Sequence, residues 1–467
     1  MRRLGLLLVL LLLPAAVGAH DPPALRPNIV LILTDDEDVR IHAFLPKTKA
    51  LLEDRGAVFP NAFVPYPLCC PSRASLLRGQ YPHNTGVLGN QPPLGGFDVF
   101  VQQGLEASTV ATWLQSVGYR TVFAGKYLNG YGDGGSDPRH VPPGWTEWYA
   151  GLGGRPYGNY DYTLNENGRI VQYGHAAEDY LTDVIARKAV EAIERAVRAG
   201  QPFFLYLATY APHAPAVPAP RHAHLFQDAP LPRPPSFNEA DVSDKPTVIR
   251  RRPPLNPRSI ARMEVLYRRR LQSLQAVDDL VETVVRTLAR LGQLDRTYLV
   301  YTSDNGFHMG EHRLPPGKNL PYEEDIRVPL VVRGPGVRPG QRIDSLVVNT
   351  DLAPTFAEIA GITPPAFVDG RSLLPLLRGQ SPRWRQSLLI QVRTPAGGGF
   401  EAIRTAEWKY VVWRTGELEL YNLRADPYEL ENLAASAPPE LVAGLSARLR
   451  ELARCAAEGC RAAEEAP

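Results

Sequence analysis

Acidic and amide side chains follow two apolar segments of this chain, and their chemistry suggests cation binding. The apolar runs Asn28–Thr34 and Tyr298–Thr302 have the pattern of strands buried on both faces. In an open α/β sheet, ligands bind beyond the carboxyl ends of the strands, so side chains that follow two such strands are expected to meet. These side chains are Asp35, Asp36, Asp304 and Asn305. Hard oxygen donors of this kind suit Ca²⁺ or Mg²⁺ better than Zn²⁺. A single acidic pair is usually part of a turn or a helix cap. Two such pairs, each at the end of an apolar strand, favour a cation site instead.

The segment from Leu68 to Gly79 places a cysteine at the expected start of a helix. Pro71 suits the first turn of that helix, and residues 74–77 continue it. Cys69 is therefore expected just before the helix begins, where free backbone N–H groups favour an anion. These residues by themselves predict either a thiolate of low pKa or a buried structural cysteine.

The same segment resembles the signature of the sulfatase family, in which a cysteine is followed by x-Pro-Ser-Arg and then by x-x-Leu-x-x-Gly. Further segments occur in the family's order, and the resemblance covers roughly residues 26 to 435; these segments are Asn28–Asp36, Gly125–Asn129, Ala211–His213, Asp304–Gly306 and Gly317–Lys318. The Cys-Cys-Pro-Ser-Arg form, Gly125–Asn129 and Gln275–Val281 are most similar to N-acetylglucosamine-6-sulfatases. The resemblance implies an alkaline-phosphatase-like fold and a sulfuric ester hydrolase.

In that family the cysteine matched by Cys69 is oxidised to formylglycine, so the resemblance implies a formylglycine-generating enzyme as a partner. The resemblance implies that one hydroxyl of the hydrated aldehyde attacks sulfur, and that the other then helps to expel sulfate. It also assigns a divalent cation, Ca²⁺ or Mg²⁺, to Asp35, Asp36, Asp304 and Asn305, with Cys69 beside it.

Four further residues have expected catalytic roles by the same resemblance. Arg73 would orient the diol, while Lys126 and Lys318 would bind the sulfate. Only seven of the 51 basic residues are lysines, so lysine at two motif positions suggests that a compact ammonium group is needed there. His213 is the expected proton donor to the leaving oxygen, with Lys318 as the competing candidate.

One position departs from the pattern of many arylsulfatases, which have histidine two residues after the first lysine. Leu128 stands there in this chain, so the base that frees the aldehyde is open. Asn129 and His308 are candidates for part of that role. His308 and His312 are also compatible with ordinary loop histidines.

Alternation of apolar runs with helical patterns predicts an α/β fold with a large, mainly parallel sheet flanked by helices. The other expected strands and helices are Thr121–Ala124, Phe203–Leu207, Val328–Val332, Thr109–Val117, Asp179–Val197 and Tyr267–Leu291. Residues 214–257 contain eleven prolines and are expected to form either a substrate-facing loop or a disordered insert.

After residue 380, short strands and a helix predict a small antiparallel sheet with one packing helix. Its expected elements are Ser387–Gln391, Glu401–Arg404, Lys409–Trp413, Glu417–Tyr421 and Pro439–Ala453. We therefore expect a signal peptide over residues 1–19, a catalytic domain over 26–380 and a C-terminal α+β subdomain over 381–467.

The N-terminus predicts export from the cell, to the periplasm or the exterior. Arg2 and Arg3 precede a short apolar run and small residues up to Ala19, the pattern of a cleaved signal peptide, with an uncleaved anchor as the alternative. The sequence has no second long apolar segment, so stable insertion into a membrane is not expected. Cys455 and Cys460 are spaced to form a small disulfide loop. A net charge of +2 gives no support for nucleic-acid binding.

Three functional hypotheses follow. The first is hydrolysis of sulfate monoesters on a sulfated sugar such as 6-sulfated N-acetylglucosamine, with aryl sulfates as further substrates. The second is a phosphonate monoester or phosphodiester hydrolase of the same superfamily. The third is a protein that binds sulfated sugar without catalysis, which the intact set of motifs disfavours.

Overall fold

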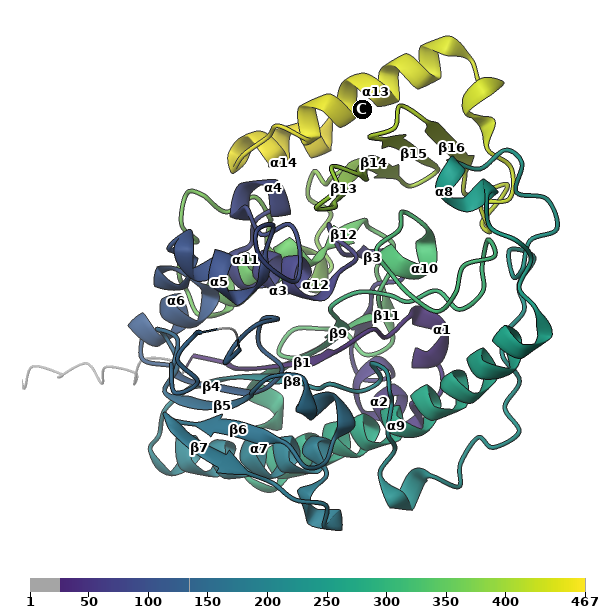
Figure 1. Ribbon diagram of the computed structural model, residues 1–467. Helices are drawn as coiled ribbons and strands as arrows, with labels where there is room; N and C mark the ends of the chain where they lie inside the picture. Colours follow the sequence, from purple (N-terminus) through teal and green to yellow (C-terminus); the bar gives the residue numbers. More distant parts are fainter. Residues whose placement is uncertain (1–25, 134, 467) are drawn as a thin grey trace, which may run out of the picture.

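A ten-stranded sheet forms the centre of the computed structural model, which describes residues 26–133 and 135–466 (Figure 1). The strand order is β11-β2-β10-β9-β1-β8-β4-β5-β6-β7, and the five strands from β9 to β5 are parallel to one another. The strands are β1 Asn28–Thr34, β2 Ala57–Val58, β4 Arg120–Gly125, β5 Glu147–Gly151, β6 Thr163–Glu166, β7 Arg169–Gln172, β8 Phe203–Ala208, β9 Thr297–Ser303, β10 Leu330–Arg333 and β11 Gln341–Arg342. The predicted mainly parallel sheet is confirmed.

Helices cover both faces of this sheet, which explains why its central strands are apolar throughout. In β1, Ile29, Leu31 and Leu33 belong to the core under α3, α6 and α11, whereas Val30 and Ile32 belong to the core under α7 and α9. The covering helices are α3 Cys69–Arg78, α6 Val110–Ser116, α7 Leu181–Arg198, α9 Pro257–Arg290 and α11 Leu352–Ile359. The shorter ones are α1 Val39–His42, α2 Pro46–Thr48, α4 Pro82–Thr85, α5 Gly96–Gln102, α8 Thr247–Arg250, α10 Glu323–Ile326 and α12 Leu374–Leu377.

A separate antiparallel sheet lies near the C-terminus and packs on α13, as predicted (Figure 1). Its strands are β13 Ser387–Arg393, β14 Gly399–Thr405, β15 Trp408–Trp413 and β16 Leu418–Asn422. The helices α13 Pro439–Leu452 and α14 Glu458–Glu465 follow, and the short pair β3 Ala62–Phe63 and β12 Val347–Val348 lies between the two large sheets.

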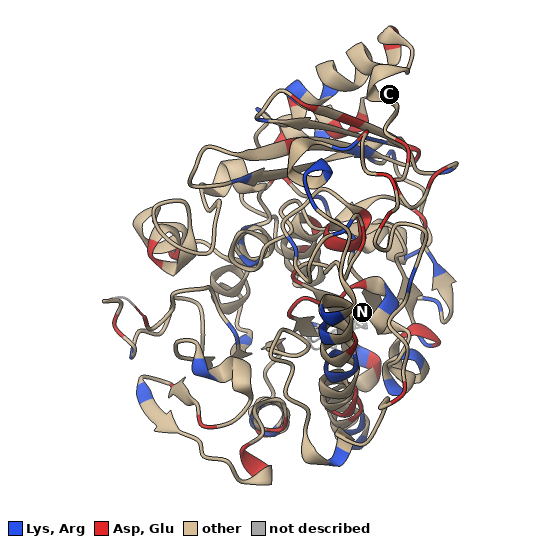
Figure 2. Ribbon diagram, turned by 45° about the vertical axis from the view of Figure 1, so that its right-hand side comes forward, with Lys and Arg blue, Asp and Glu red and all other residues tan. Residues whose placement is uncertain are grey.

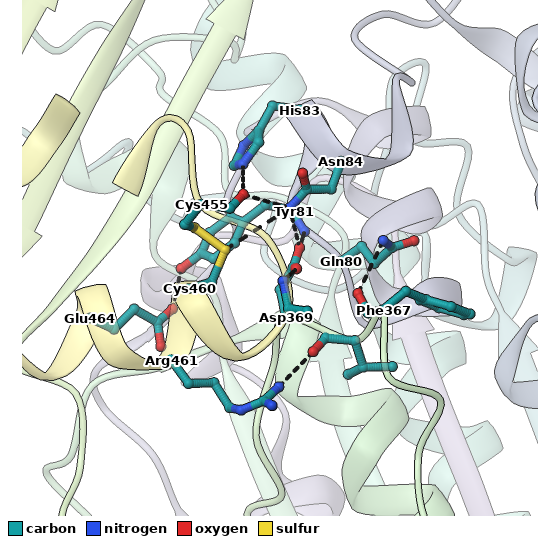
Figure 3. Close-up of a disulfide and its surroundings, with 12 residues drawn as sticks. Gln80, Tyr81, His83, Asn84, Phe367, Asp369, Cys455, Cys460, Arg461 and Glu464 are labelled. Atoms are coloured by element: carbon teal, nitrogen blue, oxygen red, sulfur yellow. Dashed lines mark hydrogen bonds between the residues drawn. A yellow bond between two sulfur atoms is a disulfide. The ribbon is translucent and has the colours of Figure 1, made fainter. Parts of the chain in front are cut away.

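A disulfide between Cys455 and Cys460 closes the predicted loop and joins it to the first turn of α14 (Figure 3). The carbonyl oxygen of Cys455 accepts hydrogen bonds from His83 Nε2 at 2.9 Å and Asn84 Nδ2 at 3.0 Å. These contacts attach the C-terminal segment to α4, the helix that follows α3. Cys69 and Cys70 are free thiols.

Some elements differ from the sequence prediction. Helix α9 has 34 residues and starts at Pro257, ten residues before the predicted start, because Asn256 caps it and proline is accommodated in a first turn. Strands β5 to β7 are not in the prediction. The segment 214–257 is mainly irregular but packs on the protein through buried residues such as Lys245 and Ile249, so the disordered-insert alternative is wrong.

Acidic and basic residues are interspersed over the ribbon, in keeping with the small net charge (Figure 2). Within the described ranges, no helix is long and apolar enough to span a bilayer. The predicted signal peptide, residues 1–19, lies outside the described residues.

Candidate active site

Parallel pairing of β1 with β9 brings the two acidic strand ends together. Thr34 pairs with Ser303, so the next residues of both strands emerge at the same edge of the sheet. The Asp36 amide donates to Asp304 Oδ1 at 3.1 Å, and Asn305 Nδ2 donates to Asp36 Oδ1 at 2.7 Å. The four side chains expected to meet therefore lie together, and all are buried.

Asp36 has an uncommon backbone conformation, with φ of 69°. Such left-handed residues other than glycine persist where surrounding contacts hold them, and they concentrate at functional sites. One of these contacts comes from Arg270 of α9, whose Nη2 donates to the carbonyl oxygen of Asp36 at 2.6 Å. Arg270 is fully buried and its Nη2 also lies 3.2 Å from Asp38 Oδ2, so the guanidinium is adjacent to the acidic cluster.

Helix α3 delivers Cys69 to this cluster. Cys69 is the first residue of the helix rather than the residue before it, because the extended Leu68 occupies the cap position. Its Sγ lies 3.4 Å from Asp35 Oδ1. The hydroxyl of Ser72 donates to the carbonyl oxygen of Asp304, which fixes the helix start against the end of β9.

The environment of Cys69 does not favour a thiolate. Burial, together with the negative charge of Asp35, raises the pKa of the Cys69 thiol to about 12, despite the nearby ammonium groups of Lys126 and Lys318. The environment therefore favours a neutral thiol for the unmodified Cys69 side chain.

Arg73 lies one turn after Cys69 and connects three parts of the site. Its Nε donates to Asp304 Oδ2 at 2.8 Å, and its Nη1 donates to the carbonyl oxygen of Lys126 at 2.6 Å. Nη2 is buried and has no hydrogen-bond partner among the described residues, so it remains available to another acceptor. Although burial alone would lower it, the pKa of Arg73 is raised by Asp304 and Asp35, which keeps the guanidinium charged.

Two lysines flank Cys69 from different loops. Lys126 Nζ contacts Asp35 Oδ2 at 2.5 Å, while Lys318 Nζ contacts Asp36 Oδ1 and lies 2.8 Å from Cys69 Sγ. Burial alone would lower the pKa of each lysine, but Asp35 raises that of Lys126 and Asp36 raises that of Lys318. Both ammonium groups therefore stay charged next to Cys69.

His213 lies at the rim of the cluster. Its Nε2 is 3.5 Å from Asp36 Oδ2, its Nδ1 donates to the carbonyl oxygen of Ala214 at 2.6 Å, and its ring stands over Tyr157. The side chain is 26% exposed, more than any other member of the cluster, so it lies at the solvent-accessible edge of the site.

The residues present fit a divalent cation. Asp35, Asp36, Cys69 and His213 each have a ligand atom within 4.8 Å of the others. Asn305 Oδ1 is buried and accepts no hydrogen bond from the described part of the chain, as expected for a group that binds an ion. Burial alone would raise the pKa of Asp35 and of Asp36. However, the charge of Lys126 lowers the pKa of Asp35, and the charge of Lys318 lowers the pKa of Asp36. Both carboxylates are therefore ionised.

Two cavities adjoin the cluster, and among the described residues they share no lining residue. The cavity along Lys126 has a volume of about 350 Å³, and the cavity along Lys318 has a volume of about 510 Å³. Leu128 and Asn129 line the Lys126 cavity, whereas His308 lines the Lys318 cavity. His308 Nδ1 is 2.7 Å from Asp325 Oδ1.

His312 lies in neither cavity lining. Its Nδ1 is 2.6 Å from Glu239 Oε2, and its ring packs on Tyr322. These buried contacts are those of a structural histidine.

Sequence reasoning missed several residues that support the cluster. Arg270 falls on the buried face of α9 with Met263, Tyr267 and Leu274, so the helical period alone marks it as a buried arginine. Tyr157 had no comparable signal, because it lies in the short 3₁₀ helix Arg155–Gly158, which is too brief to show a periodic pattern. Its ring centre is 5.1 Å from Lys126 Nζ.

Comparison with known proteins identifies the family. The sulfatase family model matches residues 27–362, which is most of the chain. The chain belongs to the sulfatase family. A second family model, described as the C-terminal part of N-sulphoglucosamine sulphohydrolase, matches residues 310–455 of this sulfatase.

Relatives of this sulfatase include the N-acetylglucosamine-6-sulfatase of Homo sapiens, which is 39% identical over 97% of the chain and 90% of the human protein. An arylsulfatase of Volvox carteri is 36% identical over 95% of the chain and 76% of its own length. Among solved structures, a protein in complex with its substrate D-glucosamine-2-N,6-O-disulfate superposes with a TM-score of 0.78 and 25% identity, over 91% of this chain and 97% of that one.

The fold is also shared with a phosphonate monoester hydrolase of Agrobacterium radiobacter. That structure gives a TM-score of 0.73 at 22% identity, over 91% of this chain and 95% of the hydrolase. This likeness shows the fold alone. The sulfatase family assignment makes the protein a sulfuric ester hydrolase.

Proposed function

We propose that this sulfatase removes the 6-O-sulfate from glucosamine units of a sulfated saccharide. The convergence of Lys126, Lys318 and Arg73 on Cys69 carries the proposal, because three fixed positive charges around one position suit a sulfate group. The similarity to the human N-acetylglucosamine-6-sulfatase and to the structure that holds D-glucosamine-2-N,6-O-disulfate supports glucosamine as the sugar.

Two groups complete the proposed site when they are in place. Formylglycine at position 69 supplies the nucleophilic hydroxyl, and a Ca²⁺ or Mg²⁺ ion held by Asp35, Asp36, Asp304 and Asn305 increases its acidity and neutralises sulfate charge. Calcium fits an all-oxygen donor set of this kind.

The protein side chains have distinct tasks in this proposal. Lys126 and Lys318 hold the sulfuryl oxygens, and the free Nη2 of Arg73 orients the group at position 69. His213 is the proposed proton donor to the leaving oxygen, because it is the partly exposed member of the cluster. Lys318 is the competing donor, although its raised pKa makes it the weaker acid.

The sugar that carries the sulfate is proposed to occupy the Lys126 cavity. Its described lining includes Asn90, Asn129, Asp98 and Asp133, which are hydrogen-bonding partners for neutral hydroxyl and amide groups. The volume is at the lower end of small-ligand pockets, which suits a single sugar ring.

The proposal also includes export of the protein, on the basis of the signal-peptide pattern of residues 1–19. N-terminal sequencing of protein recovered from the medium or periplasm tests this point. A sequence starting at Met1 would contradict cleavage.

Turnover of 6-sulfated N-acetylglucosamine, measured as released sulfate, tests the proposed activity. The tryptic peptide that contains Cys69 is analysed by mass spectrometry in the same preparation, and formylglycine is expected there. Cys69→Ala should abolish turnover while leaving the melting temperature near that of the parent. Faster hydrolysis of an aryl phosphodiester than of any sulfate ester, or full activity with an intact thiol, would overturn the proposal.

A further inference from the structure

The Lys318 cavity lies between the loop 314–320 and the C-terminal sheet. Its apolar wall is formed by Leu314, Leu320, Val392, Phe400 and Trp413. Thr394, Thr415 and Arg252 add polar groups to its lining. The cavity is therefore built from segments that are distant in the sequence, and the C-terminal sheet supplies one side of it.

This cavity is linked to the reacting position through Lys318, as the Lys126 cavity is linked to it through Lys126. Lys318 belongs to its lining, and the ammonium group of Lys318 contacts Cys69. A ligand whose sulfate lies at Cys69 and whose sugar fills the Lys126 cavity therefore leaves the Lys318 cavity free for a neighbouring group.

The two cavities differ in charge. Besides Lys126, the Lys126 cavity has Asp98 and Asp133 in its described lining, so a further anionic group on the bound sugar is repelled by these carboxylates. The Lys318 cavity has Arg252 and Lys318 and no carboxylate among its described lining residues. An anionic group is accordingly favoured in the second cavity and disfavoured in the first.

Arg252 is available for such a group. Its Nε donates to the carbonyl oxygen of Val248 at 3.0 Å, and its own carbonyl oxygen accepts from Arg313 Nη1 at 3.2 Å. These bonds hold the residue at the cavity, yet Arg252 makes no ion pair with any carboxylate of the described chain, whereas Arg250 lies 3.6 Å from Glu417. Arg251 is exposed and does not line the cavity.

We propose that the Lys318 cavity binds the sugar next to the one that bears the scissile sulfate, and that Arg252 recognises a carboxylate or sulfate on that neighbouring sugar. The apolar wall contacts the C–H face of the ring, and the guanidinium pairs with the anion. This inference rests on the proposed function and deepens it, because it makes an acidic oligosaccharide the preferred substrate.

Three pairs of disaccharides test the assignment. Each disaccharide contains 6-sulfated N-acetylglucosamine and a second sugar, and the two members of a pair differ in the order in which these sugars are linked. The second sugar carries a carboxylate, a sulfate or no charge. For each enzyme, kcat/KM for an anionic disaccharide is divided by kcat/KM for the neutral one. Arg252→Ala should lower this ratio by about tenfold or more, because the charged hydrogen bond to the anion is lost; a tenfold change corresponds to about 1.4 kcal/mol. Arg251→Ala, the matched control, should leave the ratio unchanged.

The anion with the larger dependence on Arg252 is the one that the cavity recognises. Equal losses on the anionic and the neutral disaccharides, or the same change in Arg251→Ala, would overturn the assignment. Thr415→Trp provides a second variant at an exposed turn. This variant should lower kcat/KM for every disaccharide relative to the monosaccharide. An unchanged ratio of disaccharide to monosaccharide kcat/KM would also overturn the assignment. Monosaccharide turnover in the parent enzyme separates these results from a failure of the proposed function itself.

Discussion

The ammonium group of Lys318 lies 2.8 Å from the Sγ atom of Cys69 and also contacts the carboxylate of Asp36. One positive charge therefore touches both the residue expected to become formylglycine and a proposed ligand of the cation. Lys126 makes the corresponding contact with Asp35. The reacting position is thus enclosed by two ammonium groups whose partners are already ionised.

Replacement of Lys318 by Met should lower kcat/KM by about 100-fold or more, since removal of one fixed donor to a developing anion has effects of this size. Lys318→Arg should remain impaired, because a planar guanidinium does not fit the place of a compact ammonium group. Lys188→Met, which removes a lysine paired with Glu166, is the control and should keep the parent rate. Normal kinetics of Lys318→Met would contradict the role of Lys318.

Removal of divalent cations should abolish turnover and lower the melting temperature. The reason is that Asp35, Asp36 and Asp304 place three buried carboxylates side by side. A cation at 100 times its Kd stabilises the folded state by about 2.7 kcal/mol. Dialysis against a chelator, followed by addition of Ca²⁺ or Mg²⁺, is monitored by sulfate release and thermal unfolding. Asn305→Leu should weaken the rescue by either metal, and undiminished activity in excess chelator would exclude a cation.

Loss of the Arg73 charge should destabilise the protein as well as inactivate it. Arg73→Met leaves Asp304 as an uncompensated buried charge, and breaking a buried pair in this way costs about 3–5 kcal/mol. With both variants measured in excess chelator, so that cation binding does not contribute, the double variant with Asp304→Asn removes both charges and should regain much of the melting temperature without regaining activity. Recovery of neither property would show that Arg73 acts mainly through its bond to the Lys126 carbonyl.

The arrangement of the proposed ligands followed from the sequence because parallel neighbouring strands end at one edge. The runs before Asp35 and Asp304 are uniformly apolar, and this pattern is sufficient to predict their burial in a common sheet. The start of α3 was predicted to within one residue, from Pro71.

Features that depend on long-range packing were not predictable in the same way. The left-handed backbone of Asp36 has no local signal such as glycine, since it is held by Arg270 from a helix 234 residues away. The Lys318 cavity likewise requires the C-terminal sheet to pack against loop 314–320, which no periodicity reveals. Its contrast in charge with the Lys126 cavity becomes visible only after folding.

Acid should weaken the attachment of the C-terminal sheet through Glu323 of α10. Its carboxylate lies 2.9 Å from Arg404 Nε in β14 and 3.6 Å from Lys409 Nζ in β15. Burial alone would raise the pKa of Glu323, but the charges of Arg404 and Lys409 lower it from 4.5 to about 2. The folded-state pKa is depressed, so the stabilisation is fully present above pH 4.5 and is lost as the pH falls from there towards 2. A shift of this size corresponds to roughly 3 kcal/mol.

Glu323→Gln should therefore lower the melting temperature at pH 7. It should also make the decline of the melting temperature between about pH 4.5 and pH 2 shallower, as measured by thermal unfolding across a pH series. Glu440→Gln, at an exposed position of α13, should follow the parent curve, and an identical decline in Glu323→Gln would assign the acid sensitivity to other carboxylates.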